Sequence, residues 1–405
     1  MLSLLRNPVF SVLWIGQWLS EMGDRIYVTA LVAFLYEMTR SSFDVGKLLV
    51  LAGLSSTLFG PLAGLLVDRL SLRTMLVLSN FVSALVVALM VIVRASWQIY
   101  VIAFILAAVG RLFLIAWSAT VPAVLSKEHL VNANALTATG RRVAQILGPA
   151  LGGLLVATGQ AWVAFAINAL SFAVAGLAAL LALANVPPSG PALHGRQPSL
   201  FKELREGLTY IRTEQFAIGA IMGLALIGVS IGINNAVIVA FADRALGVGP
   251  AAFGILISAL GAGMLSGGLI SPFLGQTALK SAVPIAAPAI MGTSLILLSA
   301  VSSLALALPL RFSMGIAMSI YTISIWASLQ TLVKGELRGR VFSAVRTIED
   351  LAILFAMGIG SLIADVLGVR IAISGSGAFA LGAAIVAAVA GRHATSSRYA
   401  PVAKP

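Results

Sequence analysis

Long apolar stretches recur along almost the whole chain, and they restrict its fold more than any other feature. A helix needs about 20 predominantly apolar residues to cross a lipid bilayer. Twelve stretches meet this need, at residues 9–36, 46–67, 73–94, 98–122, 141–158, 161–184, 216–242, 252–273, 281–301, 303–328, 345–364 and 369–391. The 405-residue chain is 60% hydrophobic and only 10% charged, which is outside the range of soluble globular domains. We therefore predict an all-α integral membrane protein with twelve transmembrane helices.

The basic residues are spread over short loops instead of forming one patch. The formal net charge is +12, but this dispersed pattern indicates membrane topology and contact with anionic lipid, and no nucleic-acid partner is expected. Lys and Arg are concentrated in the loops that share a side with residue 1. Both termini are therefore predicted to be cytoplasmic, in a multi-pass protein of a bacterial cytoplasmic membrane.

The longest polar interruption divides the chain into two halves. Prolines between residues 187 and 198 cannot continue a helix, and Phe201, Leu204 and Leu208 then fall on one helical face, as in helices at a membrane surface. The predicted organisation is an N-terminal six-helix bundle at 1–184, a cytoplasmic linker with an amphipathic helix at 185–215, a C-terminal six-helix bundle at 216–391 and a cytoplasmic tail at 392–405. A shift of 207 residues (334 − 127) aligns the segment 127–130 with 334–337 and Gly153 with Gly360, which predicts two six-helix pseudo-repeats.

The loop between the second and third stretches carries a spaced set of charges. Its Gly-x3-Asp-Arg-x3-Arg pattern consists of Gly64, Asp68, Arg69 and Arg73. It resembles the loop between helices 2 and 3 of the major facilitator superfamily, although Ser71 stands where that motif usually has glycine. The resemblance implies a conformational latch that closes the cytoplasmic face. The alternative is a basic loop that only sets topology.

Further stretches resemble one group within that superfamily. The segments 122–125, 128–135 and 336–343 resemble the corresponding loops of macrolide-efflux and enterobactin-exporter-like proteins. The fifth stretch resembles the glycine-proline motif of antiporting members, and its residues are Gly140, Gly148, Pro149, Gly152 and Gly153. Glycines four residues apart let a neighbouring helix pack closely, and Pro149 bends the helix. The motif is interpreted either as a seal or pivot, or as ordinary small-residue packing.

Ionisable residues inside the first and fourth stretches are candidates for function, because buried charges in a membrane are costly. Glu21, Asp24 and Arg25 share a helix face, and Arg111 lies at the same depth, about 18 Å from the inner face at 1.5 Å of rise per residue. We expect Asp24 and Glu21 to bind a proton or a cationic substrate, with Arg111 as the tuning partner. The alternative is a static ion pair that holds the helices in register.

The C-terminal half has its own polar residues inside the predicted spans. The possible cavity residues are Asn234, Asn235, Arg311, Glu349 and Asp350. Arg311 is also close enough to a helix end to reach the membrane surface with its head group. Glu349 and Asp350 lie near the end of a span, where pairing with Arg346 is the favoured interpretation.

The predicted function is secondary active transport, namely proton-coupled efflux (antiport) of a small amphipathic or drug-like molecule by a monomer. No cofactor or metal is expected, because the chain has no cysteine and its three histidines fall in loops or the tail. No phosphate-binding Gly-rich loop or catalytic cluster is found, so the chain is not predicted to be an enzyme. Two alternatives stay open: a proton-coupled importer of a metabolite, and a transport-dead membrane sensor or enzyme.

Overall fold

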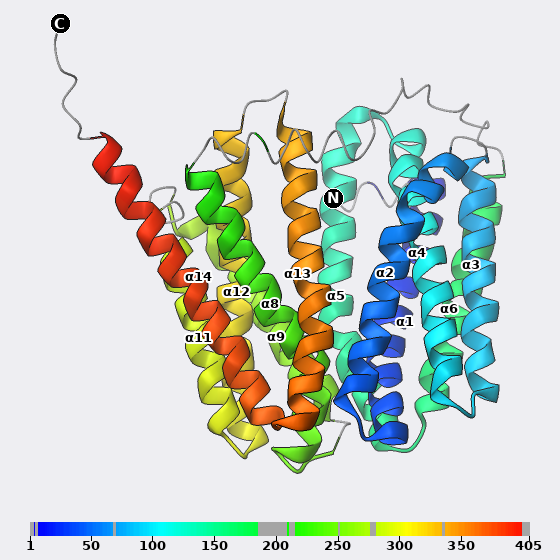
Figure 1. The fold of residues 1–405 in the computed structure, drawn as a ribbon. Helices are drawn as coiled ribbons and strands as arrows, with labels where there is room; N and C mark the ends of the chain where they lie inside the picture. Colours follow the sequence, from blue (N-terminus) through cyan, green and yellow to red (C-terminus); the bar gives the residue numbers. More distant parts are fainter. Residues whose placement is uncertain are drawn as a thin grey trace, which may run out of the picture. The chain divides into compact units, whose positions relative to one another are not determined.

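The computed structural model describes residues 7–67, 70–184, 215–249, 252–275, 281–333 and 337–398, together with Leu4 and Thr209. Twelve long α-helices make up most of these residues (Figure 1). Their bounds are α1 Pro8–Thr39, α2 Ser42–Val67, α3 Leu72–Ala88, α4 Ser96–Val124, α5 Leu130–Ala157, α6 Ala161–Ala182, α8 Gln215–Arg244, α9 Ala252–Ile270, α11 Val283–Ala300, α12 Leu304–Leu332, α13 Arg338–Val366 and α14 Val369–Arg398. The single turns η2 Leu89–Ile92, η3 Lys127–His129 and η4 Ser271–Phe273 adjoin α3, α5 and α9.

Each predicted span coincides with one of these helices, so the all-α prediction with twelve long helices is confirmed. Ten of the helices in the described residues are long and apolar enough to cross a membrane. The two others are α1, which carries Glu21, Asp24 and Arg25 in its middle, and α5, which carries Arg141 and Arg142. The predicted starts of two helices were too late. Residue 130 begins α5 instead of 141, and residue 338 begins α13 instead of 345, because a helix can continue through polar residues beyond the membrane core.

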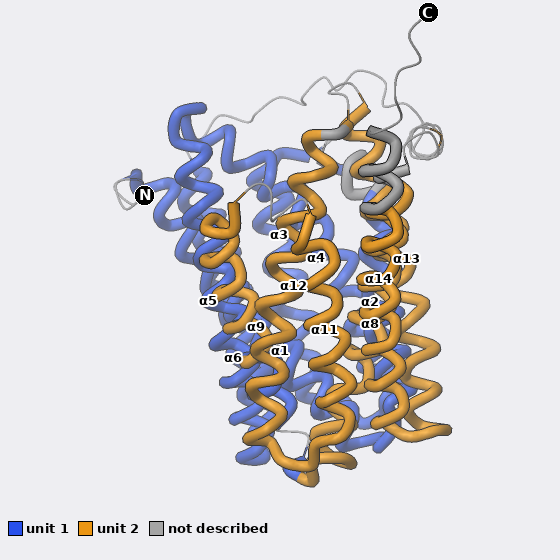
Figure 2. The backbone as a smooth tube through the Cα atoms, turned by 90° about the vertical axis from the view of Figure 1, so that its left-hand side faces the viewer, with its two compact units in different colours: residues 1–194, 248–258 blue, residues 195–247, 259–405 orange. Residues whose placement is uncertain are grey.

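The chain forms two compact units (Figure 2). Unit 1 comprises residues 1–194 and 248–258, and unit 2 comprises residues 195–247 and 259–405. In unit 1, α1 packs against α5 and α6, while α3 packs against α4 and α6. In unit 2, α8 packs against α13 and α14, while α11 packs against α12 and α14. A shift of 207 residues carries Pro8 onto Gln215, the first residues of α1 and α8, and the same shift relates every one of these helix pairs. The predicted pseudo-repeat is therefore present in the packing.

The glycines of α5 lie against α1. A β-carbon at Gly152 would be 3.1 Å from the Cβ of Thr29, and one at Gly140 would be 2.7 Å from the indole of Trp18. Gly148 similarly has the backbone of Arg25 within 3.3 Å of that position. Such close approach of two backbones is possible only where side chains are absent, so these glycines determine how tightly α5 packs on α1.

A second face of α5 contacts the stretch of α9 that belongs to unit 1. Ser258 donates a hydrogen bond to the carbonyl of Ile146 at 2.7 Å. A β-carbon at Gly254 would be 2.8 Å from the Cα of Gly153 and would also contact the carbonyl of Pro149. The glycine-proline segment of α5 is thus packed on two sides.

Arg370, near the start of α14, joins three helices of unit 2. Its guanidinium donates to the carbonyls of Ser299, Val301 and Ala245 and to the hydroxyl of Ser302. Ala245 follows α8 and the other acceptors lie at the end of α11. The last carbonyls of a helix have no partner within the helix, so Arg370 stabilises the ends of both helices.

Several predictions fall on residues that the structure does not describe. Asp68 and Arg69 lie outside the described residues, as does the predicted linker apart from Thr209 and Gln215. α14 continues to Arg398, so the first residues of the predicted tail are helical.

Candidate functional site

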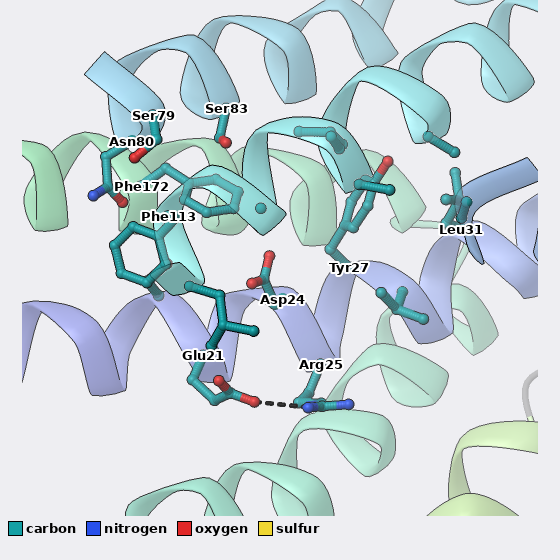
Figure 3. Close-up of a pocket in the computed structure, with 18 of the residues that line it drawn as sticks. Glu21, Asp24, Arg25, Tyr27, Leu31, Ser79, Asn80, Ser83, Phe113 and Phe172 are labelled. Carbon is teal, nitrogen blue, oxygen red and sulfur yellow. Dashed lines mark hydrogen bonds and ion pairs between the residues drawn. The ribbon is translucent and has the colours of Figure 1, made fainter. Parts of the chain in front are cut away.

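Unit 1 contains a partly open cavity of about 430 Å3 whose lining combines charged, polar and aromatic residues (Figure 3). The polar lining residues include Gln17, Glu21, Asp24 and Arg25 of α1, Ser79, Asn80 and Ser83 of α3, and Arg141 of α5. Aromatic rings come from Tyr27, Phe113, Trp117 and Phe172. This volume is typical of small-molecule sites, which measure about 300–1,000 Å3.

Asp24 is the acidic group that projects into this cavity. Its carboxylate points from α1 toward α3 (Figure 3). The side-chain amide of Asn168, a fully buried residue of α6, donates to Asp24 Oδ1 at 3.2 Å. Ser171 in turn donates to Asn168 Oδ1 at 3.3 Å, which orients the amide so that its nitrogen faces the carboxylate. Among the described residues, no Lys or Arg forms an ion pair with Asp24.

Gly23 makes this hydrogen bond possible. A β-carbon at this position would lie 2.8 Å from Asn168 Oδ1 and 3.1 Å from the Cβ of Ser171. Because glycine has none, α1 and α6 approach closely enough for Asn168 to reach Asp24. The adjacent Gly23 and Asp24 therefore act together: the missing side chain of Gly23 lets α6 approach α1, and Asp24 accepts the hydrogen bond from Asn168 that this approach allows.

Glu21 is in a different electrostatic environment, one turn away. Arg25 donates to Glu21 Oε1 at 2.7 Å, and Arg141 Nε lies 3.8 Å from Glu21 Oε2. Glu21 is therefore held between two guanidinium groups, one from its own helix and one from α5. The sequence prediction did not include Arg141, since the early part of α5 was expected to be a loop.

Arg111 does not join this group, and its predicted role beside Asp24 and Glu21 needs correction. Its Nε is 3.5 Å from the β-carbon position of Gly60, on α2, and it is absent from the cavity lining. Gly110 and Phe113 line the cavity instead. The depth estimate was sound, and Ala107 and Leu114, one turn before and after Arg111, line the cavity. The long side chain of Arg111 is nevertheless directed to Gly60 of α2 and not to Asp24.

In unit 2, the predicted polar residues form two separate groups. Arg311 is fully buried and donates to Asn234 Oδ1 at 2.6 Å, so the expectation that Arg311 reaches the membrane surface is wrong. Asn235 is half-buried. Arg346 lies 3.4 Å from Glu349 Oε2 and 3.4 Å from Asp350 Oδ1, which is the pairing that the sequence favours.

Of the latch residues, Gly64 lies in α2 and Arg73 in α3. Arg73 donates to the carbonyl of Leu180, near the end of α6, at 3.0 Å. This contact joins α3 to α6 within unit 1. It gives Arg73 a structural role that does not depend on Asp68 or Arg69. Among the described residues, no cluster of His, Cys, Asp and Glu is suited to a metal ion.

Twelve membrane-length helices in two related units, with a charged cavity inside one of them, define a multi-pass membrane transporter. The chain belongs to the major facilitator superfamily: a family model described as "Transmembrane secretion effector" matches residues 1–402. It is 25% identical over 402 residues to the uncharacterized MFS-type transporter YfiS of Bacillus subtilis, covering 95% of this chain and 93% of the relative. It is also 25% identical over 370 residues to macrolide efflux protein A of Streptococcus pyogenes, covering 89% and 90%.

The fold matches solved transporter structures. The nucleoside transporter NupG has a TM-score of 0.74 at 12% identity, with 94% of this chain and 99% of that chain covered. An identity this low supports the fold alone. Membership of this family makes the protein a secondary transporter of a small-molecule substrate in a lipid bilayer, and not an enzyme.

Proposed function

We propose that this transporter exports a small amphipathic or drug-like molecule in exchange for protons, and that Asp24 carries the proton or the cationic group of the substrate. The observation that supports this most directly is the carboxylate of Asp24, which projects into the cavity without an ion-pair partner among the described residues. A carboxylate inside a membrane is costly unless a cation or hydrogen-bond donors compensate it. Asn168 donates one hydrogen bond but carries no charge, so a proton or an organic cation is needed to neutralise the carboxylate of Asp24.

The contacts support different roles for the two acidic residues in this proposal. Glu21 already has Arg25 and Arg141 as partners, so it serves as a static ion pair between α1 and α5. When Asp24 and Glu21 are both ionised, the two carboxylates balance the two guanidinium groups. Loading a proton or a cation at Asp24 then changes the net charge of the site by one, and this change can couple binding to a conformational shift.

Export as the direction of transport is supported by the name of a relative, macrolide efflux protein A, and by the glycine-proline pattern of α5. We place the protein in a bacterial cytoplasmic membrane as a monomer with both termini in the cytoplasm, because the relatives are bacterial and because of the distribution of Lys and Arg. In this proposal, Gly148, Pro149 and Gly152 keep α5 tightly packed as a seal, and Asp68 and Arg69 close the cytoplasmic side.

Transport by purified protein in liposomes tests the role of Asp24. Tetraphenylphosphonium and ethidium serve as probes, in one assay driven by a pH gradient and in a second that measures exchange at equal pH. Asp24→Asn is expected to lose gradient-driven transport and to retain some exchange, while Glu21→Gln is expected to lower the yield of folded protein. Asp350→Asn, which changes a half-exposed carboxylate of α13, is the matched control. Full gradient-driven transport by Asp24→Asn would refute the assignment, and failure of the wild type to move either probe would refute the cationic substrate.

A further inference from the structure

The wall of the cavity opposite Asp24 is formed by three polar residues of α3. Ser79, Asn80 and Ser83 all line the cavity and are each at most 5% exposed. Spacings of three and four residues place Asn80 and Ser83, and likewise Ser79 and Ser83, on one helix face. Figure 3 shows all three on the side of the cavity that faces the carboxylate of Asp24. The cavity therefore has a second polar end.

Part of the hydrogen-bonding capacity of this cluster is already used. Ser79 Oγ donates to the carbonyl of Leu76 at 3.2 Å, and Asn80 Nδ2 donates to the same carbonyl at 2.7 Å. These contacts hold the Asn80 side chain so that its carbonyl oxygen is left over. Neither this oxygen nor the hydroxyl of Ser83 has a hydrogen-bond partner within the described part of the chain.

A third unpartnered group belongs to the same cavity. The hydroxyl of Tyr27 is buried and has no hydrogen-bond partner among the described residues, and Tyr27 lines the cavity. A buried polar group without a partner destabilises the folded protein, and such groups in native structures usually meet water or a ligand. The Tyr27 hydroxyl is a buried atom of this kind, whereas the oxygens of Asn80 and Ser83 are not among the buried unpartnered atoms, so a ligand in the cavity can reach them.

Aromatic rings line the space between the two polar ends. Phe113 of α4 and Phe172 of α6 are drawn between the α3 residues and Asp24 in Figure 3. Rings favour an apolar or aromatic body, and their faces also attract a cation. From Asp24 to α3, the cavity lining is thus first anionic, then aromatic at Phe113 and Phe172, and finally neutral and able to form hydrogen bonds.

We infer that Asn80 and Ser83 form a specificity subsite for a hydroxyl or amide group at the end of the substrate remote from its cationic centre. This inference rests on the proposed function of Asp24 and adds the substrate class: an organic cation with an apolar body and a neutral hydrogen-bonding group. Ser83 donates to or accepts from that group, and Asn80 accepts through its free carbonyl oxygen. A cation without such a group still binds at Asp24 but gains nothing from α3.

Two probes that differ by one hydroxyl group test the subsite: tetraphenylphosphonium and its derivative with a 4-hydroxyl on one ring. Equilibrium binding of both to the full-length protein in lipid nanodiscs gives the preference of each variant. One hydrogen bond between neutral groups changes an affinity by about two- to ten-fold. The wild type is expected to prefer the hydroxylated probe by a factor in this range, and Ser83→Ala to lose that preference while its affinity for tetraphenylphosphonium stays unchanged.

The controls separate the failure of this inference from the failure of the proposed function. Ser118→Ala removes an exposed hydroxyl of α4 that bonds only to its own helix, and it should retain the preference. Ser83→Cys keeps the shape of the side chain and should lose the preference as Ser83→Ala does. A preference that persists in both Ser83 variants, or that the wild type lacks, overturns the subsite. Undiminished binding of both probes by Asp24→Asn overturns the proposed cation site instead.

Discussion

The tight contact between α1 and α6 at Gly23 leads to the sharpest test of the site. Gly23→Ala adds one methyl group, 2.8 Å from Asn168 Oδ1 and close to both side-chain atoms of Ser171. Neither neighbour is the end of a long flexible side chain, and both are buried, so the helices must separate or Asn168 must rotate. In either case Asn168 moves away from Asp24.

The size of the effect follows from two contributions. Inserting a methyl group into a packed interior costs about 1–3 kcal/mol, and losing a hydrogen bond to a charged group costs about 1.5–3 kcal/mol. Since 1 kcal/mol corresponds to about 2–4 °C in Tm for a unit of this size, Gly23→Ala should lower Tm by several degrees. Gradient-driven transport of tetraphenylphosphonium should fall more steeply than the amount of folded protein.

Thermal unfolding in detergent and transport in liposomes measure the two quantities separately. Gly375→Ala is the matched control, because a β-carbon there meets nothing within 4 Å and alanine is the better helix former. Combining Gly23→Ala with Ser171→Gly removes the closest obstacle and should restore part of the Tm. The reasoning is refuted if Gly23→Ala keeps wild-type Tm and transport. It is also refuted if the loss of Tm in the double variant equals the sum of the losses in Gly23→Ala and Ser171→Gly alone.

Three further predictions concern the fold. Arg370→Lys should lower Tm by several degrees, since one ammonium group cannot reach acceptors at the ends of both α8 and α11. The half-exposed ion pair of Arg244 with Asp365 is the comparison, and Arg244→Lys should change Tm by less than about 2 °C. Arg311→Met should reduce the yield of folded protein, because it leaves the buried Asn234 without its hydrogen-bond donor. Adding Asn234→Leu should restore part of this yield, and a double variant with no recovery would contradict the prediction. In this cysteine-free chain, Ser126→Cys should be labelled by a membrane-impermeant thiol reagent from the cytoplasm and Gln160→Cys from the opposite side, and the reverse pattern would invert the proposed topology.

The sequence predicts the helices well, because the length of an apolar stretch and the thickness of a bilayer are directly related. It also identifies Asp24 as exceptional, since an acidic residue in the middle of such a stretch needs an explanation. Neither argument depends on how the helices pack, and so both could be made before the structure was known.

The partners of Asp24 and Glu21 could not be predicted in the same way. Asn168 is one polar residue in an apolar helix, and only the packing of α6 on Gly23 shows that it reaches Asp24. Depth along a helix axis favoured Arg111, yet the direction of a side chain around that axis decides which neighbour it meets. Arg141 was missed for a different reason. The helix was expected to begin at residue 141, whereas α5 begins at Leu130, so Arg141 was not considered as a partner of Glu21.

The internal repeat separates what the fold needs from what transport needs. Close packing of the corresponding helices is kept in both copies, although through different glycines: Gly152 of α5 contacts α1, and Gly360 of α13, the counterpart of Gly153, would place a β-carbon 2.9 Å from the Cα of Ile233 on α8. The chemistry is not kept. The shift of 207 residues carries Asp24, Arg25, Asn80, Ser83 and Asn168 onto Ile231, Gly232, Ala287, Ile290 and Gly375. Unit 2 instead buries Arg311, whose counterpart in unit 1 is Phe104. Both copies of one helix arrangement pack closely through glycines, but the residues at the positions of Asp24, Asn80, Ser83 and Asn168 in unit 2 are apolar or glycine. The fold therefore does not require these polar side chains. This is the reason to look for the chemistry of transport at Asp24.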